Sequence, residues 1–252
     1  MDLGLSGKVA MVAAASSGLG LGVARALAGE GAHVSICARD AGRLADAHAE
    51  LDTLGAGKII SEAVDLNDPA AIEGWVEHTE REFGAIDVVV SHTPGVKQGP
   101  VKDFGVDAYR GAFDTAFVPH AALVLAAMPH LKHQGWGRVL MITSEAVRQP
   151  IPHNVLSGVA RLGILGFARN LVYEFGDSGV TVNVLAPGYH DTTALRGPSG
   201  NGVAEVAAEV PLNKVGDPDD FGALAAFLAS AQAAYVTGAL LLVDGGNTRA
   251  VA

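Results

Sequence analysis

Three polar residues in the middle of the sequence have side chains that can hold a reacting oxygen. Ser144 is followed by the segment SGVAR, which runs from Ser157 to Arg161. A serine hydroxyl can orient a substrate oxygen by hydrogen bonding, but alone it is a poor proton donor. The guanidinium of Arg161 is a fixed cation with a planar fork of donors, suited to ribose hydroxyls, a carboxylate or a halide. These residues predict a holding site rather than a proton relay.

Residues that could supply a proton lie at other points of the chain. Tyr189 and His190 follow Pro187-Gly188, His153 precedes the SGVAR segment, and His92 ends an apolar run. A histidine titrates near neutrality and is therefore a plausible acid. Each of these residues is also compatible with an ordinary loop position. The proton donor stays open between them and solvent, with Ser157 acting through a bound water as a further alternative.

A glycine-rich turn early in the chain predicts a phosphate-binding site. The stretch AAASSGLG ends an apolar run and opens a helical pattern. Glycines let the backbone approach a pyrophosphate closely, and a helix N-terminus supplies free N–H groups and the positive end of the helix dipole. A purely structural turn is the alternative interpretation. The candidate cofactor-binding residues of the turn are Ala14, Ser16, Ser17, Gly18, Leu19 and Gly20.

Short β-rich runs alternate with longer helical patterns along the chain. The β-rich runs cover residues 8–15, 33–38, 58–64, 86–92, 137–143, 180–186 and 239–244, and the helical patterns cover 18–31, 40–54, 68–84, 106–133, 154–175, 203–210 and 218–230. Such alternation predicts parallel strands joined by right-handed crossovers. We expect a single doubly wound, Rossmann-type α/β domain over residues 1–252, with about seven strands and helices on both faces. The Gly, Ser and Pro content of residues 192–202 predicts a mobile substrate loop.

Composition excludes several classes of protein. The 252 residues are 49 % apolar and have a formal net charge of −10, with no basic run, so nucleic-acid binding is not expected. The single cysteine, Cys37, falls in an apolar run, and this position predicts a buried thiol. No cluster of Cys, His and carboxylate residues has metal-ligand spacing, so we expect no metal site. The first residues are not typical of a secretory signal and no apolar run looks like a membrane span, which predicts a cytoplasmic protein.

The turn and three further motifs resemble the short-chain dehydrogenase/reductase family over nearly the whole chain. Ala13–Gly20 corresponds to the family's TGxxxGxG turn, and Asp65-Leu66 to the position that would meet the adenine amine. The stretch 182–188, with Thr192, matches the segment that lies over the nicotinamide, and 236–246 matches the last strand. Outside the turn, the cofactor contacts that the resemblance implies are Asp65, Leu66, His92, Pro187, Gly188 and Thr192.

The family's catalytic residues are mostly replaced in this chain. Of the family's usual Asn, Ser, Tyr and Lys residues, this chain retains only the serine, as Ser144. The replacements are Ala14 for the first turn glycine, Ser91-His92-Thr93-Pro94 for Asn-Asn-Ala-Gly, Ala116 for asparagine, Ser157 for tyrosine and Arg161 for lysine. The resemblance implies that Arg161 holds the nicotinamide ribose while Ser144 and Ser157 hydrogen-bond a substrate oxygen. Six other histidines are given no role: His33, His48, His78, His120, His130 and His133.

The end of the second β-rich run predicts a preference for NADP(H) over NAD(H). A family member that prefers NAD would usually place an acid at position 38, to accept a hydrogen bond from the ribose 2′-hydroxyl. Ala38 is neutral, and Arg39 follows it with a side chain able to pair with a 2′-phosphate. A solvated arginine at the start of a helix is the alternative.

Three functions are compatible with these residues. The first is an NADP(H)-dependent oxidoreductase acting on a small carbonyl or alcohol at a rebuilt site. The second is a lyase similar to halohydrin dehalogenases, whose Ser…Tyr-x-x-x-Arg pattern fits Arg161 but not Ser157. The third is a non-catalytic nucleotide-binding homologue, acting as a sensor or assembly partner. Stretches 121–131 and 162–172 are apolar on more than one helical face, which predicts self-association; the resemblance implies a homotetramer.

Overall fold

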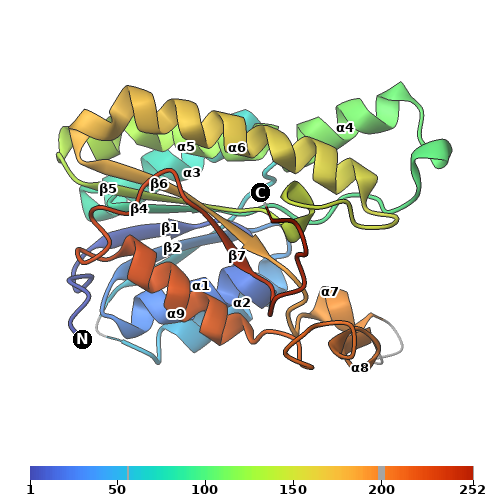
Figure 1. The fold of residues 1–252 in the computed structure, drawn as a ribbon. Helices are drawn as coiled ribbons and strands as arrows, with labels where there is room; N and C mark the ends of the chain where they lie inside the picture. The colour runs from blue at the N-terminus through green and yellow to red at the C-terminus, as the bar shows by residue number, and fades with distance from the viewer. Residues whose placement is uncertain (56, 198–201, 252) are drawn as a thin grey trace.

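Seven parallel strands form one sheet in the order β3-β2-β1-β4-β5-β6-β7 (Figure 1). The strands are β1 (Val9–Val12), β2 (His33–Ala38), β3 (Ile59–Ala63), β4 (Val88–Ser91), β5 (Gly137–Ile142), β6 (Val180–Pro187) and β7 (Leu240–Val243). This computed structural model describes residues 1–55, 57–197 and 202–251. Strands β1, β4, β5 and β6 are buried along their whole length, which explains their continuous apolar runs. The predicted fold class is confirmed.

Helices cover both faces of the sheet. Helices α1 (Gly18–Gly29), α2 (Ala41–Leu51) and α9 (Pro218–Ala229) lie on one face, and α3 (Pro69–Phe83), α5 (Val118–His133) and α6 (Val155–Phe175) lie on the other, with α4 (Val106–Ala116) beside α6 (Figure 1). Each face has its own apolar core. The side chains of Asp40, Asp68 and Asp217 cap the N-termini of α2, α3 and α9, which fixes where these helices begin.

The prediction of a single helix over residues 106–133 is wrong. The chain breaks at Phe117, which ends α4 and precedes α5. Pro119 explains the break, because proline has no N–H to donate and its ring disfavours helical backbone in the preceding residue. The 192–202 segment contains the short helix α7 (Thr193–Arg196), and its residues 198–201 lie outside the described part of the chain. Other short elements are η1 (Val101–Asp103), η2 (Glu145–Val147), η3 (Gly176–Ser178) and α8 (Gly202–Ala207).

Two helical stretches are long and apolar enough to cross a membrane by length and composition, contrary to the sequence expectation. They are Val106–His133 and Val155–Ser178. The first is interrupted at Phe117, and both pack against the sheet, where a core helix has the same composition. In each stretch less than half of the most apolar window is buried within one chain. Their outward sides therefore leave apolar surface uncovered.

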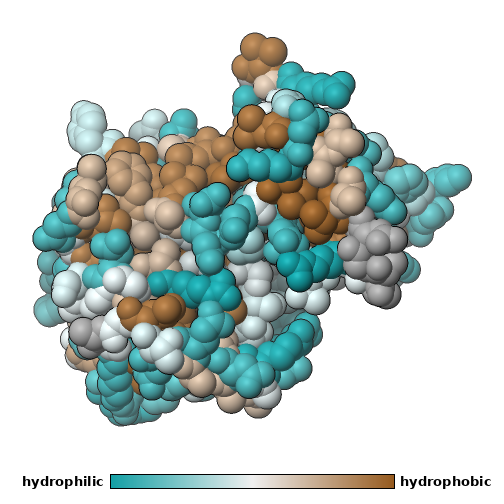
Figure 2. Space-filling view, turned by 90° about the horizontal axis from the view of Figure 1, so that it is seen from below, coloured by the Kyte–Doolittle hydropathy of each residue, from teal (hydrophilic) through white to brown (hydrophobic). Residues whose placement is uncertain are grey.

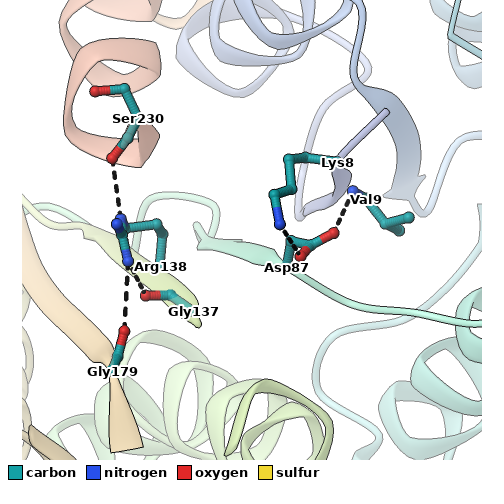
Figure 3. A network of polar contacts seen from close by, with 7 residues as sticks. All are labelled: Lys8, Val9, Asp87, Gly137, Arg138, Gly179 and Ser230. Carbon is teal, nitrogen blue, oxygen red and sulfur yellow. Dashed lines mark hydrogen bonds and ion pairs between the residues drawn. The ribbon is translucent and has the colours of Figure 1, made fainter. Parts of the chain in front are cut away.

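A polar network ties the amino ends of the central strands together (Figure 3). The buried carboxylate of Asp87 accepts hydrogen bonds from Lys8 Nζ and from the backbone N–H of Val9, both at 2.9 Å. The buried guanidinium of Arg138 donates to the carbonyls of Ser230 at 3.1 Å and Gly137 at 2.8 Å. This network lies at the sheet edge opposite the carboxyl ends of the strands, so it stabilises the fold away from the candidate site.

Candidate active site

A cleft of about 1090 Å³ crosses the carboxyl ends of the strands. The segments that follow β1, β2, β3 and β4 line it, together with one side of α4, Arg161 on α6 and Thr192–Ala194. The order of the strands reverses between β1 and β4, and ligands of doubly wound sheets bind at such a switch point. The fold therefore places most of the predicted cofactor-binding residues in one cavity.

The turn after β1 has the geometry of a phosphate-binding loop. Ala14 adopts φ +52° and Gly18 φ +57°, and a Cβ added to Gly20 would lie 2.4 Å from the carbonyl oxygen of Ala14. Ser17 precedes the first turn of α1, and its side chain makes no capping hydrogen bond. The first N–H groups of α1 have no partner within the helix, so they are available to an anion. These residues fit a dinucleotide pyrophosphate.

Two arginines line the cleft at the end of β2. Arg39 makes no ion pair among the residues that the structure describes. Arg43 Nε pairs with Asp40 Oδ2 at 3.1 Å, so this second cation is partly neutralised. Sequence reasoning missed Arg43, although its place in the first turn of the following helix pointed to the same edge. Asp65 also lines the cleft, and its Oδ1 accepts hydrogen bonds from the N–H and the side-chain amide of Asn67, both at 3.0 Å; among the described residues Oδ2 accepts none.

Arg161 is buried, and it uses most of its donors within the protein. Its Nε donates to Ser157 Oγ at 3.2 Å, and Nη2 donates to the carbonyl of Pro94 at 3.0 Å. Longer contacts of 3.5 Å join Nη1 to the carbonyl of Ile142 and Nη2 to that of Thr93. No carboxylate pairs with this guanidinium among the described residues. Burial lowers the pKa of Arg161 to about 10, so the side chain is cationic at neutral pH.

Two neutral histidines lie near this cation. Burial, aided by the charge of Arg161, lowers the pKa of His92 to about 3, and the buried Nδ1 of His92 has no hydrogen-bond partner in the described part of the chain. His120 is fully buried on α5, where its Nδ1 lies 2.7 Å from Ser91 Oγ. Burial lowers the pKa of His120 well below its ordinary value. Sequence reasoning gave His120 no role, because nothing in its spacing shows that α5 brings it to the end of β4.

The two candidate serines lie beside the cleft rather than along its lining. Ser144 follows β5 and precedes η2, where its Oγ accepts a hydrogen bond from the N–H of Ala146 at 3.2 Å. Ser157 is buried in the first turns of α6, and its Oγ accepts from Arg161. In both cases the hydroxyl oxygen is the acceptor, so each hydroxyl proton is left to donate. Both can therefore act as neutral hydrogen-bond donors.

Of the predicted proton donors, His92 lies near Arg161 in the cleft, whereas Tyr189, His190 and His153 do not line it. Tyr189 and His190 line a separate cavity of about 240 Å³. Burial and the carboxylates of Glu145 and Glu209 raise the pKa of Tyr189, which makes it a weaker acid. His190 packs edge-on against Phe221, with Nδ1 3.1 Å from the carbonyl of Gly188, and burial lowers its pKa. His153 is exposed at φ +60°.

The remaining predicted cofactor contacts follow β6. Pro187 is the last residue of β6, and Gly188 donates its N–H to the carbonyl of Val243. Thr192 does line the cleft, and its side chain lies against Gly18. In the described ranges, no group of three or more His, Cys, Asp or Glu side chains is placed to hold a metal ion.

A buried carboxyl that the sequence reasoning missed lies directly after Ser144. Glu145 is 2 % exposed, and both of its oxygens accept from Asn247 Nδ2 at 3.0 Å. Burial, then the charge of Asp244, raises the pKa of this carboxyl above its ordinary value. The available signal was a glutamate directly after a candidate serine that closely follows a strand, but the burial of Glu145 depends on contacts with the C-terminal segment.

Comparison with known proteins identifies the family. The family model described as enoyl-(acyl carrier protein) reductase matches residues 13–248. The 3-oxoacyl-acyl-carrier-protein reductase of Escherichia coli K12 is 32 % identical over 245 residues, which cover 97 % of this chain and 98 % of that protein. The chain belongs to the short-chain dehydrogenase/reductase family. Membership in this family accounts for the glycine-rich turn after β1 and for the motif at the last strand. It also places the chain among oxidoreductases.

Two solved short-chain dehydrogenase/reductase structures are close in shape. L-sorbose reductase from Gluconobacter frateurii, complexed with NADPH and L-sorbose, has a TM-score of 0.93 and 25 % identity, covering 100 % of both chains. An NADPH-bound short-chain oxidoreductase from Pseudomonas aeruginosa PAO1, described as containing an atypical catalytic center, has a TM-score of 0.90 and 28 % identity. That match covers 96 % of this chain and 97 % of the other. At the level of the family, these neighbours favour NADP(H).

Proposed function

We propose that this chain is an NADP(H)-dependent oxidoreductase that interconverts a small carbonyl compound and its alcohol. The observation that carries the proposal is the continuity of the cleft, from Arg39 and Arg43 through the Ala14–Leu19 turn to His92 and Arg161. This order of groups suits a 2′-phosphate, a pyrophosphate and the nicotinamide half of one cofactor. The NADPH-bound neighbours support the same cofactor. We further propose a cytoplasmic location.

Within this proposal, the protein orients and polarises the substrate oxygen. The bound nicotinamide supplies or removes a hydride at the substrate carbon. Ser144 and Ser157 donate hydrogen bonds to the carbonyl oxygen without ionising. The fixed charge of Arg161 stabilises negative charge that develops on this oxygen, because the buried cation is weakly screened. One N–H of Nη1 is left over from the contacts described above and is available for the nicotinamide ribose.

The contacts around the other parts of the cofactor follow from the same cleft. Asp65 and Leu66 border the adenine end, and Asp65 Oδ2 is free to accept from the adenine amine. Pro187, Gly188 and Thr192 border the nicotinamide. These assignments are part of the proposal, as is a small-molecule substrate.

Titration with the two reduced cofactors tests the proposal directly. Fluorescence titration should give tighter binding of NADPH than of NADH. The Arg39→Ala variant should lose about 1.5–3 kcal/mol of NADPH affinity, roughly tenfold to over a hundredfold, because a charged hydrogen bond to the 2′-phosphate is removed. Arg81→Ala, which removes an exposed arginine of α3, is the matched control and should bind as the parent does. Equal binding of both cofactors would reject the preference.

A non-catalytic nucleotide-binding role is the second candidate. It is favoured by the hydrogen bonds of Arg161, because most N–H groups of this side chain already donate to backbone carbonyls and to Ser157. A panel of carbonyl substrates separates the two roles, since binding of NADPH without turnover of any member supports the sensor. A role as a lyase similar to halohydrin dehalogenases is less well supported, because the Ala14–Leu19 turn is open to a cofactor. Measured binding of NADPH would exclude the lyase role.

A further inference from the structure

Within α5, which the structure describes in full, His120 is the only buried residue with a polar side chain. The other buried residues of this helix are Pro119, Leu123, Val124, Ala127, Met128 and Leu131. His120 lies in the first turn of the helix and is fully buried. Burying an imidazole costs free energy unless its nitrogens are hydrogen-bonded, a cost that an apolar side chain at this position would not carry. The histidine therefore indicates a need for its hydrogen bonds rather than for packing alone.

Both nitrogens of the His120 ring face hydroxyl groups at the carboxyl end of β4. Nδ1 lies 2.7 Å from Ser91 Oγ, and Nε2 lies 3.5 Å from Thr93 Oγ1. Burial, followed by the charges of Arg161 and His92, keeps the pKa of His120 well below its ordinary value, so the ring is neutral. A neutral imidazole has one N–H and one lone pair and can hydrogen-bond to both hydroxyls at once. His120 thus holds the chain on both sides of His92, where it leaves the sheet.

The same segment holds Arg161 through its backbone. The carbonyl oxygens of Thr93 and Pro94 accept hydrogen bonds from Arg161 Nη2, at 3.5 Å and 3.0 Å. Thr93, Pro94 and Arg161 line the cleft, whereas Ser91 and His120 do not line it in the described part of the chain. Thr93 is the shared residue, because its side chain contacts His120 and its carbonyl contacts the guanidinium. A continuous path of contacts therefore joins His120 to the cleft.

The orientation of Arg161 depends strongly on this segment. The guanidinium has four hydrogen-bond acceptors, Ser157 Oγ and the carbonyls of Ile142, Thr93 and Pro94, and two of these four come from the segment that His120 holds. Among the described residues no carboxylate pairs with this buried cation. Only neutral dipoles therefore fix the guanidinium plane, and a shift of the chain after β4 would displace half of them.

We propose that His120 is a positioning residue for the nicotinamide end of the cleft, acting on Arg161 through the segment from Ser91 to Pro94. This inference rests on the function proposed above, in which Arg161 meets the nicotinamide ribose and the substrate oxygen. His120 itself touches neither. By fixing the carbonyls of Thr93 and Pro94, it keeps the guanidinium in one orientation, with the remaining N–H of Nη1 held for the ribose. Without His120 the guanidinium takes other orientations, and fewer molecules have the binding geometry.

The first experiment measures which half of the cofactor loses affinity. In calorimetric titrations, His120→Leu should bind NADPH roughly tenfold more weakly than the wild type, as for the loss of one hydrogen bond. Adenosine 2′,5′-bisphosphate, which lacks the nicotinamide half, should bind within about twofold of the wild type. Met128→Ala, at a buried position on the same helix, is the matched control; it should lower the melting temperature and leave both affinities unchanged. Equal losses for the two ligands, or no loss for NADPH, would overturn the proposal while leaving the proposed function intact.

A double-mutant cycle tests whether His120 acts through Arg161. In the Arg161→Ala background, the His120→Leu change should weaken NADPH binding by less than about twofold, because the group that His120 positions is absent. A merely structural contribution of His120 would instead weaken binding by the same factor in both backgrounds. Independent, multiplying losses would therefore contradict the assigned role.

Two milder variants test the same role if His120→Leu does not fold. Ser91→Ala removes the hydroxyl that lies 2.7 Å from Nδ1, and it should weaken NADPH binding while sparing adenosine 2′,5′-bisphosphate. His120→Asn keeps a polar group near the place of Nδ1, and it should bind NADPH more tightly than Ser91→Ala does. Wild-type NADPH affinity in Ser91→Ala would overturn the proposal. If the wild-type protein binds neither ligand, the proposed function fails, and the role assigned to His120 fails with it.

Discussion

At the scale of single residues, Ala14 occupies a conformation that costs an L-residue energy. Its φ of +52° is in the left-handed region, at the position where the family has glycine. We expect Ala14→Gly to stabilise the fold by about 1 kcal/mol, raising the melting temperature by roughly 2–4 °C. Ala49→Gly, at an exposed position within α2, is the control and should lower it by a similar amount. A lower melting temperature in Ala14→Gly would show that the strain is absent.

The buried histidines predict sensitivity to acid. His92 and His120 have folded-state pKa values below the ordinary 6.5, so the unfolded chain binds more protons as pH falls below that value. Their contribution to stability is present above pH 6.5 and is lost as pH falls. Denaturant unfolding between pH 7.5 and 5 should show a smaller loss for His120→Asn than for the wild type. His133→Asn, at an exposed position on α5, should match the wild type; equal slopes for both variants would contradict this.

The sequence could predict only those parts of the candidate site that are formed by residues close together in the chain. The turn at Ala14–Leu19 and Arg39 were predictable, because each follows a recognisable strand within a few residues. The hydrogen-bond partners of Arg161 were not, because Pro94, in the segment after β4, and Ile142, at the end of β5, are distant from it in sequence. Glu145 was missed for the same reason, since its environment is completed by Asn247, about a hundred residues away.

At the scale of elements, the network at the amino ends of β1 and β4 should control stability without affecting the site. Asp87→Asn removes the charge that pairs with Lys8 and one acceptor oxygen, in a side chain that is 4 % exposed. We expect a loss of about 1–3 kcal/mol in the free energy of unfolding, measured in urea. NADPH affinity should not change, because the cleft lies at the opposite edge of the sheet. Asp107→Asn, in an exposed pair with Arg110, should have no measurable effect; a weakened NADPH affinity in Asp87→Asn would contradict the separation.

The elements themselves were largely predictable because their patterns are long and buried. The seven strands follow apolar runs, and Asp40, Asp68 and Asp217 mark three helix starts. The break at Phe117 was missed although Pro119 signals it, because the apolar pattern continues across the junction. The short helix α7 was not predictable, since a Gly- and Pro-rich stretch specifies little local structure.

At the scale of the whole molecule, exposed apolar side chains gather on the outer helices. Leu125 on α5 is 54 % exposed, and Val159 and Leu162 on α6 are 42 % and 52 % exposed. The opposite face, seen in Figure 2, shows apolar patches among hydrophilic residues. Phe227 on α9 and Leu242 on β7 are 38 % and 39 % exposed, which fits a second interface at the last strand. Two distinct apolar surfaces are what a tetramer requires, so self-association stays our prediction.

The final prediction is that a charge on α6 separates the protomers. Leu162→Glu places a carboxylate in the middle of the α5/α6 surface, where burial against a second copy would leave it unpaired. Light scattering at micromolar concentration should give a tetramer for the wild type and a smaller species for the variant. Leu54→Glu, which changes a 43 % exposed leucine just beyond α2, should remain tetrameric. A monomeric wild type, or the same mass for both variants, would contradict this interface. Because Leu162 lies next to Arg161 on the same helix, NADPH affinity measured in parallel would show whether assembly supports the cleft.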